Sequence, residues 1–167
     1  MTAQGTRDAT TPVIGEVPPD AHYLAAAQRA WLALVADIPV GVLARATRHV
    51  TDSGLEHSAL LRMLYVDQRH RGSGIATTLL ETARAAMTPL QVQHDGMTSV
   101  AGLSFVEKRR IPRCPCTNCA TKPFSAADAC TKGKQELARA VDAWESGNRQ
   151  LLSAADSAAV TAKPGLP

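Results

Sequence analysis

The sequence predicts an α/β chain of the α+β type, in which a mixed, mostly antiparallel sheet is flanked by helices. Two short apolar runs, residues 31–35 and 40–45, are separated by a four-residue turn, which is typical of a hairpin. A longer apolar run at residues 59–66 stops before two glycines, and residues 75–87 then repeat apolar side chains at helical spacing.

The N-terminal half contributes most of the predicted strands. Residues 1–20 are polar and contain three prolines, so we expect a flexible N-terminus. Residues 21–30 have the composition of a short helix that leads into the hairpin. The Thr-Asp-Ser-Gly sequence at 51–54 marks a loop, and the apolar run at 59–66 predicts a strand in the middle of the sheet.

The C-terminal half predicts fewer strands and a long helix. The helix over residues 75–87 ends at Thr88-Pro89, because proline disfavours helix at the residue before it. Residues 90–94 alternate like a strand with one buried face, and Phe105-Val106 is interpreted as the start of a last short strand. Residues 126–152 predict a helix with an apolar stripe, which would pack on the core or on a second copy in a homodimer. Residues 153–167 are interpreted as a frayed tail.

Composition divides the chain near residue 108. Residues 1–107 carry a formal charge of −2, and residues 108–167 carry +5, which together give the net charge of +3. All five histidines precede residue 95 and all four cysteines follow residue 113. We therefore expect a core over 21–107 and a basic, Cys-rich segment with a C-terminal helix and tail over 108–167.

Two targeting signals are not apparent in the sequence. Its apolar runs fall short of the ~18 residues that a membrane helix needs, and the N-terminus lacks the apolar centre of a signal peptide. The expectation is a soluble, cytoplasmic protein with no membrane partner.

The run from Leu64 to Ala76 (LYVDQRHRGSGIA) contains the most informative motif. An apolar strand ends, two glycines follow one residue apart, and a helix begins at once. Backbone N–H groups at a helix N-terminus bind anions, most often phosphates. Gly72 and Gly74 allow the backbone to approach such a ligand closely, and Arg69 and Arg71 add positive charge. The run therefore predicts a pyrophosphate cradle.

The sequence Arg69-His-Arg-Gly-Ser-Gly74 resembles the acetyl-CoA signature of the GNAT acyltransferases, (Gln/Arg)-x-x-Gly-x-(Gly/Ala), and the resemblance covers about residues 28–107. It implies acetyl-CoA as cosubstrate and transfer of an acetyl group to an amine acceptor whose identity the sequence does not give. It also implies that backbone groups near the end of the strand pair with the pantetheine arm, while the glycine loop holds the pyrophosphate. The cofactor-binding residues implied in this way are Leu64, Tyr65, Val66, Arg69, His70, Arg71, Gly72, Ser73, Gly74, Ile75 and Ala76.

Candidate catalytic residues lie beside the predicted sheet. Relatives often carry a carboxylate in the strand at 59–66, but here that strand has none and His57 precedes it. His94 and Asp95 end the next strand, where the resemblance places the acceptor channel. Histidine titrates near ~6.5 and suits a general base at neutral pH. We predict His94, Asp95 and His57 as catalytic candidates.

The family usually places a tyrosine, as general acid, on a helix after the fifth strand. This chain has only Tyr23 and Tyr65, and neither sits at that place. The resemblance therefore leaves open an alternative to acetyl transfer, in which the protein is a CoA-binding domain without catalysis. Tyr65 itself is either a pantetheine contact or a core aromatic.

Four cysteines within 17 residues form a second constellation, Cys114, Cys116, Cys119 and Cys130. Tetrahedral zinc takes four thiolates, and Cys-x2-Cys spacing lets two of them bind one ion. A structural zinc site with these four ligands is the preferred interpretation. An iron–sulfur cluster, disulfides and free thiols stay open as alternatives.

Basic side chains surround the cysteines and support an alternative function. A basic, metal-bound module is typical of a DNA- or RNA-binding surface that contacts phosphates. The hypothesis is then a GNAT-like protein that binds or modifies nucleic acid through its C-terminal region. The residues concerned are Lys108, Arg109, Arg110, Arg113, Lys122, Lys132 and Lys134.

Overall fold

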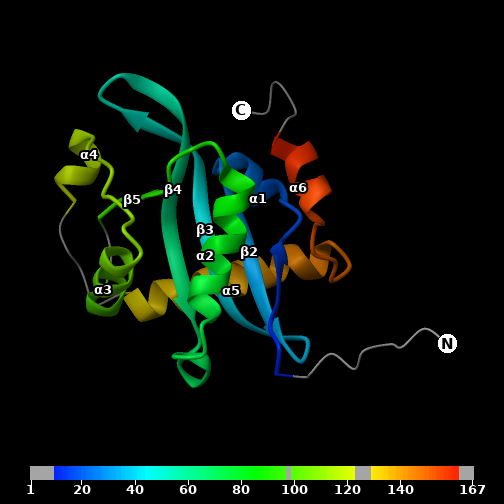
Figure 1. The fold of residues 1–167 in the computed structure, drawn as a ribbon. Helices are drawn as coiled ribbons and strands as arrows, with labels where there is room; N and C mark the ends of the chain where they lie inside the picture. Colours follow the sequence, from blue (N-terminus) through cyan, green and yellow to red (C-terminus); the bar gives the residue numbers. More distant parts are fainter. Residues whose placement is uncertain (1–9, 97–98, 123–128, 162–167) are drawn as a thin grey trace.

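The described strands form one sheet in chain order, β1-β2-β3-β4-β5, in a computed structural model that describes residues 10–96, 99–122 and 129–161. The first four strands pair antiparallel, and β4 pairs with β5 in parallel, so the predicted mixed, mostly antiparallel sheet is confirmed. The helix α2 covers one face and α5 the other (Figure 1). The strand bounds are β1 Val13–Glu16, β2 Gln28–Val35, β3 Ile38–Thr51, β4 Gly54–Val66 and β5 Gln93–His94.

The N-terminal segment is more ordered than the sequence predicted. Residues 13–16 form the edge strand β1, so the expectation of a flexible segment over 1–20 is wrong there, and residues 1–9 lie outside the described residues. The Glu16 carboxylate is buried and forms an ion pair with the Arg29 guanidinium of β2. A buried carboxylate needs such a partner, and this pairing could not be read from the local sequence.

The helix before the hairpin is shorter than predicted. It spans Ala21–Ala25 (α1), and the Asp20 side chain caps it by accepting a hydrogen bond from the Tyr23 N–H at 3.0 Å. Ala27 has a φ of 50°, which turns the chain out of the helix before β2 begins. The expected helix over 21–30 therefore gives way to strand in its last three residues.

The predicted hairpin is present and its strands are longer than the apolar runs. Ala36 and Asp37 both have positive φ, as a two-residue turn between right-twisted strands requires. The next pair, β3 and β4, continues past the sheet to Thr51 and Gly54, at the loop that the sequence predicted. This β3–β4 extension projects away from the sheet body in Figure 1.

The helix α2, Ile75–Met87, packs on the first face of the sheet, as its apolar spacing predicted. Its buried side chains Ile75, Leu79, Leu80 and Met87 join a core with residues of β2, β3 and β4. After α2 the chain returns to the sheet and β5 pairs with β4 through Leu60–Gln93 and Leu61–His94. The strand predicted over 90–94 is thus reduced to its last two residues.

The C-terminal half contains helices where the sequence predicted a strand and a tail. Phe105 and Val106 lie in α3, Val100–Lys108, which the Ser99 hydroxyl caps by accepting the Gly102 N–H at 3.0 Å. The strand predicted there is wrong, because a two-residue apolar pair cannot distinguish a strand from one turn of helix. The tail predicted over 153–167 contains α6, Ala154–Thr161, and residues 162–167 lie outside the described residues.

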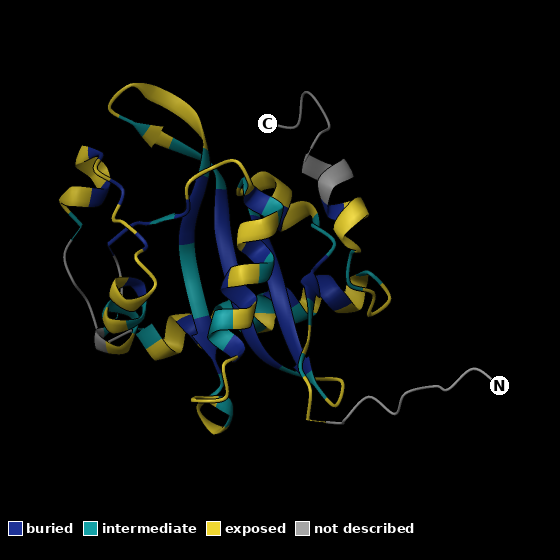
Figure 2. Ribbon diagram, in the orientation of Figure 1, coloured by how far each residue is buried: buried dark blue, intermediate teal, exposed yellow. Residues whose placement is uncertain are grey.

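The helix α5, Ala129–Ser146, covers the second face of the sheet. The first three residues of the helix predicted over 126–152 lie outside the described residues, and the helix ends at Ser146. Gly133 lies so close to the Tyr65 ring that an added Cβ would come within 2.3 Å of it. The core on this face contains Val17, Tyr23, Leu32, Val42, Tyr65, Ala140, Ala143 and Trp144. Figure 2 shows that the central part of the sheet is largely buried.

Among the described residues, the structure has no helix with the combined length and apolar character of a membrane span.

Candidate functional site

The predicted cradle is a glycine loop between β4 and α2. A 3-10 turn, Gln68–His70, follows β4, and the Asp67 carboxylate caps it by accepting the Arg69 N–H at 3.0 Å. Gly72 and Gly74 then adopt φ of 79° and 83°. A Cβ added at either glycine would meet no atom within 4 Å, so glycine is needed there for its backbone conformation, not for lack of space.

The loop presents backbone N–H groups at the start of α2. Gly74 is the N-cap residue and supplies no side chain to cap the helix. Thr78 is the first residue of α2 whose N–H bonds back, to the Gly74 carbonyl at 3.0 Å, so the N–H groups before it point out of the helix end. The Ser73 hydroxyl donates to the His70 carbonyl at 2.6 Å and so supports the loop. The positive end of the helix dipole adds to these donors.

Three arginines lie around the loop in different ways. The Arg71 guanidinium folds back, donates through Nε to the Val66 carbonyl at 2.9 Å, and lies 5.7 Å from the centre of the Tyr65 ring. Arg69 is exposed. Arg109, at the end of α3, donates to the Thr77 hydroxyl in the first turn of α2 at 2.5 Å. Sequence reasoning assigned Arg109 to a nucleic-acid surface and missed this contact, because the contact depends on the end of α3 lying beside the first turn of α2.

Next to the loop, the edge of β4 that faces β5 becomes free. Parallel pairing with β5 stops at Leu61, and the register with β3 skips Arg62, which is therefore the extra residue of a β-bulge. Bulges bend the strand and increase its twist, and they are common beside active sites. Within the described residues, no strand pairs with that edge of β4 from Arg62 to Val66.

The side chains at the end of β4 belong to the two cores. Leu64 and Val66 pack with α2, whereas Tyr65 is 6% exposed and packs under α5. Tyr65 is therefore a core aromatic in this structure. Only the backbone of this segment faces the free edge.

His94 and Asp95, two predicted catalytic residues, are buried at the end of β5. The Gly96 N–H donates to His94 Nδ1 at 3.1 Å, which identifies Nδ1 as the unprotonated ring nitrogen, because a backbone N–H can only donate. Burial lowers the pKa of His94, so the ring is neutral near pH 7. The Nδ1 lone pair of His94 already accepts the Gly96 N–H. This arrangement favours a role for His94 in holding the end of β5 over a role as general base.

Asp95 lies beside the bulge. Its Oδ2 is 3.5 Å from Arg62 Nη1 and 3.0 Å from Lys122 Nζ, so the carboxylate links β4 to the Cys-rich segment. Through Arg62, it contacts the residue at which the free edge of β4 begins. The two ion pairs hold the Asp95 carboxylate in place beside the bulge.

His57 lies elsewhere, exposed on the β3–β4 extension and paired with Arg48. Nine residues of strand separate it from Val66, about 30 Å at the usual rise. The structure therefore does not bring His57 together with the cradle.

The Tyr23 hydroxyl donates to the Glu136 carboxylate of α5 at 3.0 Å, a contact between α1 and α5.

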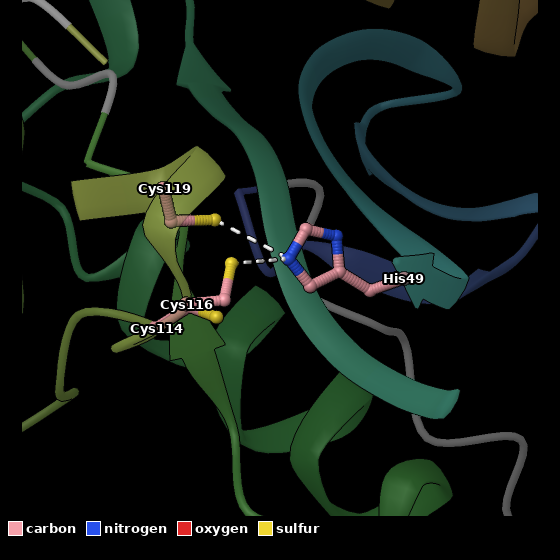
Figure 3. A group of neighbouring side chains, drawn as sticks. All are labelled: His49, Cys114, Cys116 and Cys119. Atoms are coloured by element: carbon pink, nitrogen blue, oxygen red, sulfur yellow. Dashed lines mark hydrogen bonds between the residues drawn. The ribbon is translucent and has the colours of Figure 1, made fainter. Parts of the chain in front are cut away.

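A second site gathers His49, Cys114, Cys116 and Cys119 (Figure 3). Each offers one donor atom, and all four atoms lie within 4.8 Å of one another. His49 Nε2 is 3.1 Å from Cys116 Sγ and 3.4 Å from Cys119 Sγ. The three thiols are buried. This Cys3His donor set is compatible with zinc.

The fourth predicted metal ligand, Cys130, is not part of this cluster. It is exposed at the start of α5 and lines a different cavity with Tyr65, Asp67, Gln68, Arg69 and Lys134. The structure does not bring Cys130 to the cluster, and it brings His49 there, which sequence reasoning missed. Position 49 gave no signal because it lies 65 residues before Cys114 and is brought near only by the β3–β4 extension.

The basic residues of the C-terminal half are partly used within the fold. The Arg113 guanidinium donates to the carbonyls of Cys119 and Lys122. Lys122 pairs with Asp95, and Arg109 bonds to Thr77 and lies over the Phe105 ring. In the described part of the chain, these contacts leave the predicted nucleic-acid surface without structural support.

Comparison with known proteins bears on the cradle. The family model of the acetyltransferase (GNAT) family matches residues 6–94. Among solved structures, the chain is similar to an IAA acetyltransferase from Bacillus cereus, with 21% identity, a TM-score of 0.40, and coverage of 59% of this chain and 75% of that one. The curated proteins include no match. The matched residues contain β1 to β5, α2 and the glycine loop, and they make up more than half of the sequence. The chain belongs to the GNAT acetyltransferase family.

Proposed function

We propose that this protein transfers an acetyl group from acetyl-CoA to an amine. The observation that carries the proposal is the continuity between the glycine loop at the start of α2 and the free edge of β4. The N–H groups of the loop and of the first turn of α2 would hold the pyrophosphate. The amides of the pantetheine arm would then pair with the β4 backbone between the bulge and Val66, as an added strand does at an open edge.

The cationic side chains would support the phosphates. Arg69 is exposed beside the loop, and Arg109 lies at the first turn of α2. The Arg71 guanidinium instead holds the Val66 carbonyl, so its role is to position the end of β4 while adding charge nearby. Phosphate binding at a helix end is strengthened by such nearby cations.

The reaction would take place near the bulge. The neutral amine nitrogen attacks the thioester carbonyl, a C–N bond forms, and the C–S bond breaks. The CoA sulfur leaves as a thiolate that takes up a proton, and the amine nitrogen loses one. Holding both reactants in contact removes much of the entropic barrier to this step. The acceptor would enter through a cavity of about 630 Å³ that reaches Arg62.

Asp95 is the group that we propose to influence proton transfer. It lies beside Arg62, next to the point where β4 and β5 separate. Its carboxylate pairs with Arg62 and Lys122, so it holds both cations next to the place where the acceptor amine would react. His94 is proposed to act through strand position, because its Nδ1 already accepts the Gly96 N–H.

Thermal unfolding with acetyl-CoA tests the cofactor proposal. At 100 times the dissociation constant, a ligand that binds only the folded state adds about 2.7 kcal/mol, or roughly 5–10 °C in Tm for a chain of this size. Gly72→Asp places a carboxylate in the loop and should abolish the rise. Gly54→Asp is the matched control, since Gly54 also has positive φ and open space but lies at the tip of the β3–β4 extension. No rise for the unmodified protein at saturating acetyl-CoA would refute the proposal.

A second candidate function is CoA binding without catalysis. It is favoured by the absence of a carboxylate from residues 59–66 and by the engaged lone pair of His94. Both candidates predict the thermal shift, and they differ in turnover. Release of free CoA thiol in the presence of a panel of amines supports acetyl transfer, whereas a shift without amine-dependent thiol release supports binding alone.

A further inference from the structure

We infer that His49, Cys114, Cys116 and Cys119 bind one structural zinc ion, which fastens the C-terminal segment to the β3–β4 extension. This inference concerns a site outside the cradle and does not depend on acetyl transfer. The ligand set differs from the one that the cysteine spacing predicted, because a histidine from the sheet replaces Cys130.

The size of the cluster fits the coordination sphere of zinc. With Zn–S of about 2.3 Å and Zn–N of about 2.0–2.1 Å, the donor atoms of a tetrahedral site lie about 3.5–3.8 Å apart. The two distances from His49 Nε2 to sulfur are 3.1 Å and 3.4 Å, and all four donor atoms lie within 4.8 Å. The separations of the donor atoms therefore lie within about 1 Å of those in a tetrahedral zinc site.

The local fold of the Cys-rich segment aims the three thiols at one point. Cys116 has an extended backbone and precedes the one-turn helix α4, Thr117–Ala120. One helical turn brings residues three apart onto the same side, so Cys119 returns beneath Cys116.

Cys114 is positioned by a separate set of bonds. Its N–H donates to the His94 carbonyl at 2.8 Å, and the His94 N–H donates to the Pro112 carbonyl at 3.0 Å. These bonds attach residues 112–114 to β5, next to the end of the sheet. Cys114 therefore comes to the cluster from β5, and Cys116 and Cys119 come from α4.

The histidine arrives from the sheet. His49 lies near the end of β3, and Figure 3 shows its ring facing the three sulfurs. Asp52, at the tip of the same extension, accepts the Thr117 N–H and the Thr117 hydroxyl, at 3.1 to 3.3 Å. These hydrogen bonds between Asp52 and Thr117 hold α4 against the extension, and they bring His49 within reach of the thiols.

The chemistry of the donor set excludes an open catalytic metal site. Four protein ligands fill a tetrahedral zinc, whereas catalytic zinc keeps one position for water or substrate. The thiols are 3%, 6% and 0% exposed in chain order, so solvent has little access to the ion. Binding replaces three thiol protons by the ion, and acid therefore releases it.

Metal analysis of protein purified without a metal-affinity column tests the inference. We expect about one zinc per chain, and after exchange with Co²⁺ alone, the absorption of a tetrahedral cobalt–thiolate site. Less than half an equivalent of zinc, both as purified and after addition of Zn²⁺, would overturn the inference. Stoichiometric iron with sulfide would also overturn it, in favour of a cluster.

Substitutions test the ligand set with matched controls. Cys116→Ser, Cys119→Ser and His49→Ala should each lower the zinc content well below one equivalent. Cys130→Ser makes the same change at the cysteine outside the cluster, and His57→Ala makes it at another histidine of the β3–β4 extension. Both controls should keep a full equivalent, and loss of zinc from Cys130→Ser would contradict the assignment.

Because ligand variants can fail to fold, the unmodified protein supplies an independent measurement. A strong chelator should lower its Tm by several degrees, and Zn²⁺ but not Mg²⁺ should restore it. No change of Tm with chelator, in protein shown to have lost its metal, would contradict a structural role for the ion.

Discussion

The part of the chain that matches the family, residues 6–94, and the part that follows it contribute to the fold in different ways. The first part forms the sheet, α2 and the glycine loop. The second part contributes little to the sheet, yet its helix α5 covers a whole face and shares a core with β2, β3 and β4. The comparison shows that residues after 94 complete the fold and are not a separate appendage.

The largest expected effect comes from removing α5 and α6. A chain that ends at residue 128 exposes the core under α5, which includes Tyr23, Tyr65 and Leu32. The loss should exceed the roughly 5–15 kcal/mol by which domains are stable, so we expect aggregation or no cooperative unfolding. Circular dichroism during thermal unfolding measures this. A chain that ends at residue 161 is the control, and cooperative unfolding of the shorter chain would show that the first part folds alone.

Trp144→Ala tests the same dependence with a single side chain. Trp144 is 4% exposed in the core under α5. Removing a large buried aromatic usually costs about 3–5 kcal/mol. Urea unfolding measures the change, and Asp142→Ala, at an exposed position of the same helix, should cost less than about 0.5 kcal/mol. Equal effects of the two substitutions would mean that α5 does not pack on the sheet as described.

Two glycine-to-alanine substitutions compare the two parts directly. Gly133→Ala would normally favour a helix by about 1 kcal/mol, but the new Cβ lies 2.3 Å from the Tyr65 ring, so we expect a net cost of about 1–3 kcal/mol. Gly72→Ala meets no atom and costs about 1–2 kcal/mol through its positive φ alone.

These two variants should differ in a second measurement. Gly72→Ala should weaken acetyl-CoA binding because it alters the cradle, whereas Gly133→Ala should lower stability without a specific loss of binding. Isothermal titration with acetyl-CoA, below the unfolding transition of both variants, separates the two effects. The reverse pattern would argue against the proposed location of the cofactor.

The smallest expected effect on stability tests whether the second part assists the cradle. Arg109→Gln removes a charge from the first turn of α2 and should weaken acetyl-CoA binding about 3–10-fold, while exposed contacts of this kind contribute at most about 1 kcal/mol to stability. Arg110→Gln is the matched control at the neighbouring exposed arginine. Equal affinities of the two variants would confine the cradle to the first part.

The sequence predicted features that depend on neighbouring residues and missed those that depend on distant ones. The glycine loop, the hairpin and α2 follow from local spacing, and all three are present. His49, the buried pair of Glu16 with Arg29, and Arg109 near Thr77 each depend on contacts between distant segments. Local pattern also failed at Phe105 and Val106, because two apolar residues fit either a strand or a helix.

Arg62 has a consequence for the alternation of side chains along β4. Ala59 and Leu61 face α2 before this residue, and Leu64 and Val66 face α2 after it. The residues that face α2 therefore change from odd-numbered to even-numbered at the bulge. If Arg62 were deleted, strict alternation would place each of these side chains on the face it already occupies. The core therefore has no need of the extra residue. The extra residue lies where β4 and β5 separate, and its guanidinium reaches the buried Asp95 carboxylate, so deleting it would remove an ion-pair partner of that carboxylate.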